Sequence, residues 1–204
     1  MADSLWDLPL ATALAETASA RPTPGGGSIG PVTGAFGLGL VLMALEVTHA
    51  RQPSEAGTQA IARGHELLAQ LRAHADRDVE VFDAYMRALG LPRQTDDEKA
   101  ARQVARDRAV VEAARAPLMA AETCLEVLNY AESVASLVQR NVWSDLLAGA
   151  DIVLGALRAV LRTVDINLPA LRDEVVRESI TVRVAQLFEQ ASATYSKLGT
   201  NRVV

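Results

Sequence analysis

The chain has 204 residues and a net charge of −5; 50% of its residues are hydrophobic and only 4% are aromatic. This length can bury a complete hydrophobic core and favours one domain, or at most two. A core built from Ala, Leu and Val lets helices approach closely, so the composition favours an all-α fold. The acidic balance, with only two lysines, argues against a nucleic-acid surface, because phosphate contacts require clustered basic side chains.

The single cysteine, Cys124, excludes an internal disulfide framework and is typical of a reducing compartment, so we expect a cytoplasmic protein. Its apolar surroundings predict a buried thiol rather than a nucleophile. Residues 1–10 carry two acidic side chains and no basic one, so no secretory signal peptide is expected there.

The first predicted helix lies within residues 5–20, and a second, nearly uncharged one spans about 29–50. The second segment is long enough to be mistaken for a membrane span. Its glycines lower its hydrophobicity, and Gly30, Gly34 and Gly37 recur on one face where another helix or a ligand can come close. We therefore expect the central helix of a bundle, and no membrane partner.

Four more helices are predicted from periodic apolar residues and from start and stop signals. A capping box at residues 95–98 starts a helix that Pro117 is expected to kink, and Gly90 ends the helix before it. Two of these helices exceed about 30 residues, and helices that long usually bury their far ends against a partner, which predicts a homodimer. The four ranges are about 54–90, 95–138, 144–164 and 170–195, followed by a polar tail.

A proline- and glycine-rich loop, Pro22-Thr23-Pro24-Gly25-Gly26-Gly27-Ser28, precedes the central helix. Three glycines allow backbone φ values and close contacts that other residues cannot adopt, and Ser28 is the expected N-cap. Free N–H groups at the positive end of a helix dipole would stabilise a carboxylate, a phosphate or a developing negative charge. The alternative interpretation is a tight turn before a core helix.

Two aspartates stand out from the acidic side chains on solvated faces. Asp78 shares a helix face with the apolar Phe82 and Met86, so we expect it to be buried beside them. Asp145 follows Asn141 and Ser144 at a helix start, where a carboxylate can also simply complement the helix dipole.

Amide chemistry has one further candidate, and metal chemistry has little support. Asn167 lies in an apolar turn, where it can cap the last helix or contact a ligand. His49, His65 and His74 lack the spacing of a metal site, so no metal is expected. Carboxylates and amides beside a glycine-rich loop suit proton transfer at a carbon–nitrogen centre without a covalent nucleophile.

Four blocks of this sequence together resemble the formiminotransferase-cyclodeaminase C-terminal family, which includes stand-alone methenyltetrahydrofolate cyclohydrolases. The resemblance covers residues 4 to 195 and follows the family's order and spacing. The blocks are Pro24-Gly25-Gly26-Gly27-Ser28; Asp78, Phe82 and Met86 leading to Leu91-Pro92; Asn141, Ser144 and Asp145; and Ile166-Asn167-Leu168 with Asp173.

The resemblance implies a single all-helical domain over residues 1–204, a bundle of long helices assembled as an interlocked homodimer. It also implies a folate pocket, with no tightly bound cofactor and a tetrahydrofolate derivative as the substrate. The reaction is hydrolysis of 5,10-methenyltetrahydrofolate to 10-formyltetrahydrofolate, or cyclisation of 5-formiminotetrahydrofolate with loss of ammonia. Asp78 and Asp145 are then the catalytic candidates; the substrate-binding candidates are Pro24, Gly25, Gly26, Gly27, Ser28, Phe82, Asn141, Ser144 and Asn167.

Two alternatives stay open. Departures from the family pattern, such as Ile29-Gly30-Pro31 after the glycines, fall in the expected pocket and allow another C–N bond reaction on a non-folate substrate. A non-catalytic helical dimer that serves as a binding protein is the second alternative.

Overall fold

The computed structural model describes residues 4–200, and those residues form helices and short connections without any β-strand. The all-α prediction is therefore confirmed. The α-helices are α1 (Leu10–Thr17), α2 (Gly26–Arg51), α3 (Glu55–Leu89), α4 (Asp96–Val134), α5 (Trp143–Asn167) and α6 (Glu174–Thr200), and the 3-10 turns are η1 (Leu5–Asp7), η2 (Ala135–Leu137), η3 (Arg140–Val142) and η4 (Leu168–Ala170).

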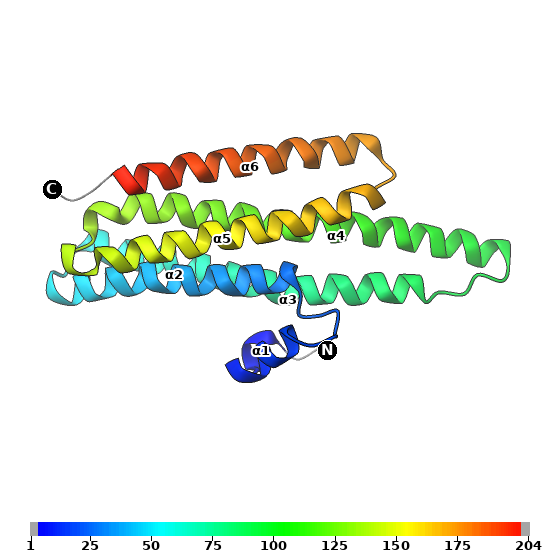
Figure 1. The fold of residues 1–204 in the computed structure, drawn as a ribbon, viewed down its shortest axis with the longest axis horizontal. Helices are drawn as coiled ribbons and strands as arrows, with labels where there is room; N and C mark the ends of the chain where they lie inside the picture. The colour runs from blue at the N-terminus through cyan, green and yellow to red at the C-terminus, as the bar shows by residue number, and fades with distance from the viewer. Residues whose placement is uncertain (1–3, 201–204) are drawn as a thin grey trace.

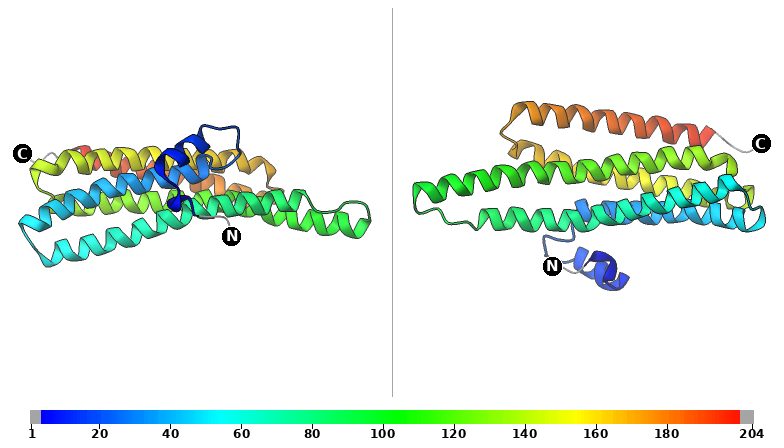
Figure 2. Two further views of the ribbon diagram at one scale, coloured as in Figure 1. Left: turned by 90° about the horizontal axis from the view of Figure 1, so that it is seen from below. Right: turned by 180° about the vertical axis from the view of Figure 1, so that it is seen from behind.

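Helices α2, α3, α4 and α5 pack along one another as an elongated bundle, and α6 lies along α4 and α5 (Figure 1). The hairpin of α3 and α4 extends beyond the start of α2 and the end of α5 (Figures 1 and 2). Helix α1 lies beside the bundle and contributes no buried residue. The 3-10 turn before it is attached to α3, because Asp76 accepts hydrogen bonds from Ser4 Oγ at 2.7 Å and from the Leu5 N–H at 2.9 Å.

Helix α2 contacts α5 backbone to backbone, as the glycine spacing predicted. A Cβ on Gly37 would lie 2.7 Å from the Gly149 carbonyl oxygen, and one on Gly149 would lie 2.5 Å from that of Gly37. Two turns nearer the start of α2, a Cβ on Gly30 would meet Val160 Cγ1 at 2.4 Å. Side chains at these positions would push the two helices apart.

Most of α2 is buried, but one face is not. Among the described residues it is the one helix long and apolar enough to cross a membrane, and 61% of its most apolar window is buried inside the bundle. The remaining face carries Phe36 and Met43, which are 55% and 37% exposed. The partly buried Val32 and Leu40 lie on the same side, so this face is an uncharged apolar stripe.

The glycine loop differs from its prediction in two ways. Helix α2 begins at Gly26, inside the glycine run, with Gly25 as the N-cap. Ser28 is therefore the third residue of the helix, and its hydroxyl accepts a hydrogen bond from the Gly25 N–H at 3.1 Å. No glycine in the described part of the chain has a positive φ, so the expected unusual backbone conformation is wrong.

The other boundaries differ in detail. The predicted helix at residues 5–20 is divided into η1 and α1, because Pro9 is the N-cap of α1. Pro117 lies within α4, which continues through it to Val134, and the capping box at Thr95 and Glu98 is present as predicted. Helix α6 continues to Thr200, beyond the predicted end near residue 195, and what remains of the predicted tail lies outside the described residues.

Replacing Gly149 with alanine is expected to lower the free energy of unfolding by about 1–3 kcal/mol, the usual cost of overpacking a tight contact. The reason is that the new Cβ would meet the Gly37 carbonyl oxygen. This is a backbone atom, which cannot move aside as the end of a flexible side chain could. Denaturant unfolding measures the change.

Gly155 on the same helix is the matched control, because a Cβ there meets nothing within 4 Å. Gly155→Ala should leave stability unchanged or raise it by up to about 1 kcal/mol through helix propensity. Equal destabilisation by both substitutions would contradict the assignment of a close helix contact to Gly149.

Candidate active site

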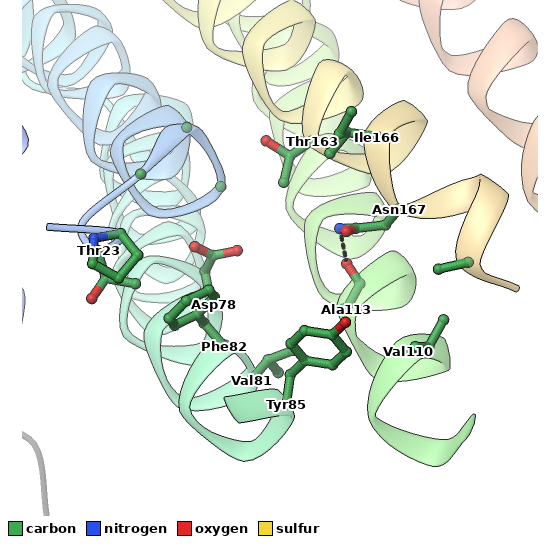
Figure 3. A pocket seen from close by; sticks show the side chains of 15 residues that line it. Thr23, Asp78, Val81, Phe82, Tyr85, Val110, Ala113, Thr163, Ile166 and Asn167 are labelled. Atoms are coloured by element: carbon green, nitrogen blue, oxygen red, sulfur yellow. Dashed lines mark hydrogen bonds between the residues drawn. The ribbon is translucent and has the colours of Figure 1, made fainter. Parts of the chain in front are cut away.

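A cavity of about 370 Å³ lies where the start of α2 and the end of α5 meet the last third of α3 and the first half of α4 (Figure 3). A volume of this size is typical of small-molecule sites. Most of its lining is apolar, with a few polar side chains from the loop before α2 and from α3 and α5. The lining residues are Pro22, Thr23, Gly25, Gly26, Gly27, Asp78, Val81, Phe82, Tyr85, Val110, Ala113, Thr163, Ile166, Asn167 and Ala170.

The Asp78 carboxyl group, from α3, lies directly against Gly27 of α2. A Cβ built on Gly27 would be 2.1 Å from Asp78 Oδ1 and 2.6 Å from Asp78 Cγ. No side chain fits there unless the carboxyl group moves. Gly27 is thus required for a close approach of the acid to the helix start, and not for an unusual φ.

Burial raises the pKa of Asp78 to about 6, and a hydrogen bond from the Ser28 hydroxyl lowers it. The Ser28 hydroxyl can also donate to the Gly25 carbonyl, at 3.2 Å. It has one proton, and a charged carboxylate is the stronger acceptor, so ionisation of Asp78 favours the bond to Asp78 over the bond to Gly25. Ser28 is fully buried. An acid with a pKa near 6 can exchange protons at neutral pH.

The start of α2 adds a positive electrostatic element. Gly26 and Gly27 are its first two residues, and N–H groups there have no acceptor within the helix. Gly26 is exposed and lines the cavity. A negative charge that develops on a ligand beside these groups would be stabilised by them.

Asn167 closes the opposite wall, at the end of α5. Its side-chain nitrogen donates a hydrogen bond to the Ala113 carbonyl oxygen at 2.7 Å (Figure 3). This bond fixes the orientation of the amide, so its oxygen remains as an acceptor for a ligand. The side chain therefore does not serve as a helix cap, which was the alternative interpretation.

Two polar residues of the cavity were not predicted from the sequence. Tyr85 lies seven residues after Asp78, and Thr163 lies four residues before Asn167, so each shares a helix face with a predicted site residue. The periodicity of α3 and α5 could have identified both. The two hydroxyl groups raise the number of hydrogen-bonding side chains in the cavity.

The predicted block at the start of α5 does not line this cavity. Asn141 and Ser144 are exposed, and Asp145 is half-buried in the first turn of α5. At 1.5 Å per residue, Asp145 lies about 33 Å from Asn167 at the other end of the helix. Within one chain, Asp78 and Asp145 therefore do not reach the same substrate atom.

The remaining predicted loop residues occupy supporting positions. Pro24 is buried next to the cavity without lining it, and Ser28 acts through its contact with Asp78. Cys124 is buried, as predicted, and burial raises its pKa to about 12. No group of three or more metal-binding side chains occurs within residues 4–200.

Several known proteins are similar to this chain in sequence, and one of known structure has a similar fold. The formiminotransferase-cyclodeaminase family profile matches residues 9–186. The chain is 34% identical to the methenyltetrahydrofolate cyclohydrolase of Methylorubrum extorquens over 185 residues, which cover 89% of both chains. It is 28% identical to the formimidoyltransferase-cyclodeaminase of Sus scrofa, covering 92% of this chain and 36% of that protein.

The crystal structure of the formiminotetrahydrofolate cyclodeaminase from Thermotoga maritima has the same fold, with a TM-score of 0.83. The two sequences are 24% identical, and the alignment covers 96% of each chain. Fold, sequence match and the order of the four sequence blocks agree, and the chain belongs to the formiminotransferase-cyclodeaminase family.

Proposed function

We propose that this protein hydrolyses 5,10-methenyltetrahydrofolate to 10-formyltetrahydrofolate. The observation that carries the proposal is the half-buried Asp78 carboxyl group, with a pKa of about 6, held beside the first N–H groups of α2 in a small-molecule cavity. The identity of 34% to a methenyltetrahydrofolate cyclohydrolase of similar length supports this reaction over others of the family.

The first step requires a base and a counter-charge. The methenyl bridge is cationic, so an ionised Asp78 beside it is favourable by charge. As water adds to the methenyl carbon, Asp78 accepts a proton from it, and a neutral tetrahedral carbon forms.

The second step requires an acid. The bond between this carbon and N5 breaks, its electron pair stays on N5, and the protonated Asp78 returns a proton to N5. The hydroxyl proton of the intermediate leaves to solvent, which completes the formyl group on N10. Overall, the cation and one water give 10-formyltetrahydrofolate and one proton. Asn167, through its free oxygen, can orient the water or the pterin ring.

The alternative reaction uses the same acid. In 5-formiminotetrahydrofolate with its formimino nitrogen protonated, N10 adds to the formimino carbon, Asp78 would transfer the N10 proton to the resulting amine, and the C–N bond to that amine breaks to release ammonia and leave the methenyl cation. The 28% identity to formimidoyltransferase-cyclodeaminases is the observation in its favour. Loss of methenyltetrahydrofolate absorbance and release of ammonia from 5-formiminotetrahydrofolate, each measured with purified protein, distinguish the two; turnover of neither would contradict the proposal.

We also propose that the active unit is a homodimer formed through the apolar stripe of α2. Phe36 and Met43 would be covered in such a contact, and α2 has no charged residue before Glu46. The interface would be isologous, because the same stripe contributes from both copies.

An antiparallel pairing of two α2 helices would bring Asp145 of one copy towards the cavity of the other. The Gln139 N–H donates to Thr48 Oγ1 at 3.0 Å, so the segment leading into α5 lies beside the end of α2. Pairing about the middle of the stripe places the end of one α2 beside the start of the other. Asp145 also lies one turn from Gly149 and so on the side of α5 that faces α2. The shared site would then hold both predicted carboxylates.

Replacing Asp78 with asparagine is expected to lower turnover by about 10²- to 10⁴-fold while substrate affinity changes little, because an amide keeps the shape but accepts no proton. Steady-state kinetics on methenyltetrahydrofolate measure both. Asp83→Asn is the matched control on the same helix outside the cavity. Similar rates for both variants would remove Asp78 from the chemistry.

The pH profile should report the ionisation of Asp78. The base form is required, so kcat/KM should fall below about pH 6. Ser28→Ala removes the hydrogen bond that lowers this pKa, so the acidic limb should move to higher pH. An unchanged acidic limb in Ser28→Ala would contradict the hydrogen bond between Ser28 and Asp78.

The ionisation of Asp78 should also change the free energy of unfolding with pH. The pKa of Asp78 is about 6 in the folded state against 3.8 unperturbed, so the folded state binds the proton more tightly. The free energy of unfolding should therefore fall as pH rises from about 4 to about 6, relative to Asp78→Asn, which lacks this loss.

Heterodimers test the shared site. A dimer of one Asp78→Asn and one Asp145→Asn chain retains one site with both carboxylates, so it should show about half of wild-type activity, although each homodimer is inactive. Two affinity tags allow its isolation. The control pairs wild type with the double variant; it should be inactive if the site is shared and half-active if each site belongs to one chain.

A further inference from the structure

Arg106 lies on the face of α4 that forms a wall of the cavity. It precedes Val110 by four residues and Ala113 by seven, and both of these line the cavity. Residues at that spacing share one side of a helix. Arg106 thus continues this wall by one turn, towards the hairpin of α3 and α4.

A neighbouring contact shows which residue of α3 lies beside Arg106. The Arg102 side chain donates two hydrogen bonds to the Leu89 carbonyl oxygen, at 3.3 and 3.0 Å. The two helices run antiparallel, so one turn from this contact places Arg106 level with Tyr85. Figure 3 shows Tyr85 and Val110 at the same end of the cavity, away from Thr163. Arg106 therefore stands at the outer end of the cavity.

The Arg106 side chain lacks a partner there. Its Nε is buried and makes no hydrogen bond, and the side chain forms no ion pair within the described part of the chain. Buried guanidinium nitrogens are normally paired, because leaving one unpaired costs free energy. Arg102 lies one turn away with the same charge, which adds a small repulsion. Arg106 thus places a positive charge that forms no ion pair within residues 4–200 at this end of the α4 wall.

We propose that Arg106 binds a carboxylate at the tail of the substrate, while Asp78 acts at its reacting end. This inference rests on the proposed folate reaction. A folate ends in a glutamate, joined to the pterin by an aminobenzoyl group, and a guanidinium is the side chain best suited to bind a carboxylate with two hydrogen bonds. Seven residues of α3 separate Asp78 from Tyr85, a rise of about 10 Å that a rigid aromatic linker can span.

The proposal is tested with two substrates that differ only in the tail. One is 5,10-methenyltetrahydrofolate, and the other is 5,10-methenyltetrahydropteroate, which lacks the glutamate. Arg106→Gln should raise KM for the first by about 10- to 100-fold, the usual value of a charge-assisted hydrogen bond, with kcat little changed. KM for the second should be the same in wild type and variant.

Arg108→Gln is the matched control, since Arg108 is exposed on another face of α4 and forms no ion pair among residues 4–200. It should leave KM for both substrates unchanged. Arg106→Lys keeps the positive charge and should recover part of the lost affinity for the glutamate-bearing substrate only.

Each other outcome overturns the proposal. In one such outcome, wild type acts on both substrates while Arg106→Gln raises neither KM value, or raises both equally. Arg106 then does not bind the glutamate tail, and the proposed folate reaction stands. If wild type acts on neither, the proposed function fails and this inference with it. Loss of helix content in both Arg106 variants, measured by circular dichroism, would assign the arginine to the fold instead.

Discussion

The backbone contact between α2 and α5 is the constraint on which the cavity depends. Gly37 and Gly149 let the two helices touch, and this holds the start of α2 beside the end of α5. A Cβ built on Gly26 would consequently lie 3.4 Å from Thr163 Oγ1 of α5. With those walls fixed, one further glycine of α2, Gly27, leaves room for the Asp78 carboxyl group of α3 to lie against the start of α2. The position of the Asp78 carboxyl group thus depends on the absence of side chains at Gly27, Gly37 and Gly149.

Local sequence signals predicted most of the fold because they act within one or two turns. The capping box at Thr95 and the glycine spacing of α2 both lie within single helices, and both are present. The start of α2 was placed wrongly, since Ser28 is as suitable at the third helical position as at the N-cap. There its hydroxyl still accepts from the Gly25 N–H, so the same residue satisfies either start.

The site could be predicted only where helix periodicity was enough. Asp78, Phe82 and Asn167 were identified, and they meet in one cavity. Arg106 was not, because a lone arginine on a polar stretch has no local signal; its position depends on the register between α3 and α4. Asp145 shows the opposite case. Its block is clear in the sequence, yet a helix of 25 residues separates it from the cavity, a distance that no local pattern reveals.

The hairpin of α3 and α4 extends past the ends of α2 and α5. Val110, at the outer end of the cavity, packs against a small cluster of Ala114, Val164, Leu171 and Ile180, which contains no residue of α2. Substitutions at Tyr85 or Arg106 therefore leave the glycine contacts of the core untouched. In the proposed reaction, the residue at the reacting bond and the residue at the substrate tail therefore lie on parts of the molecule that can vary independently. A lineage with this architecture can change the ligand it accepts in small steps, without passing through an unstable intermediate.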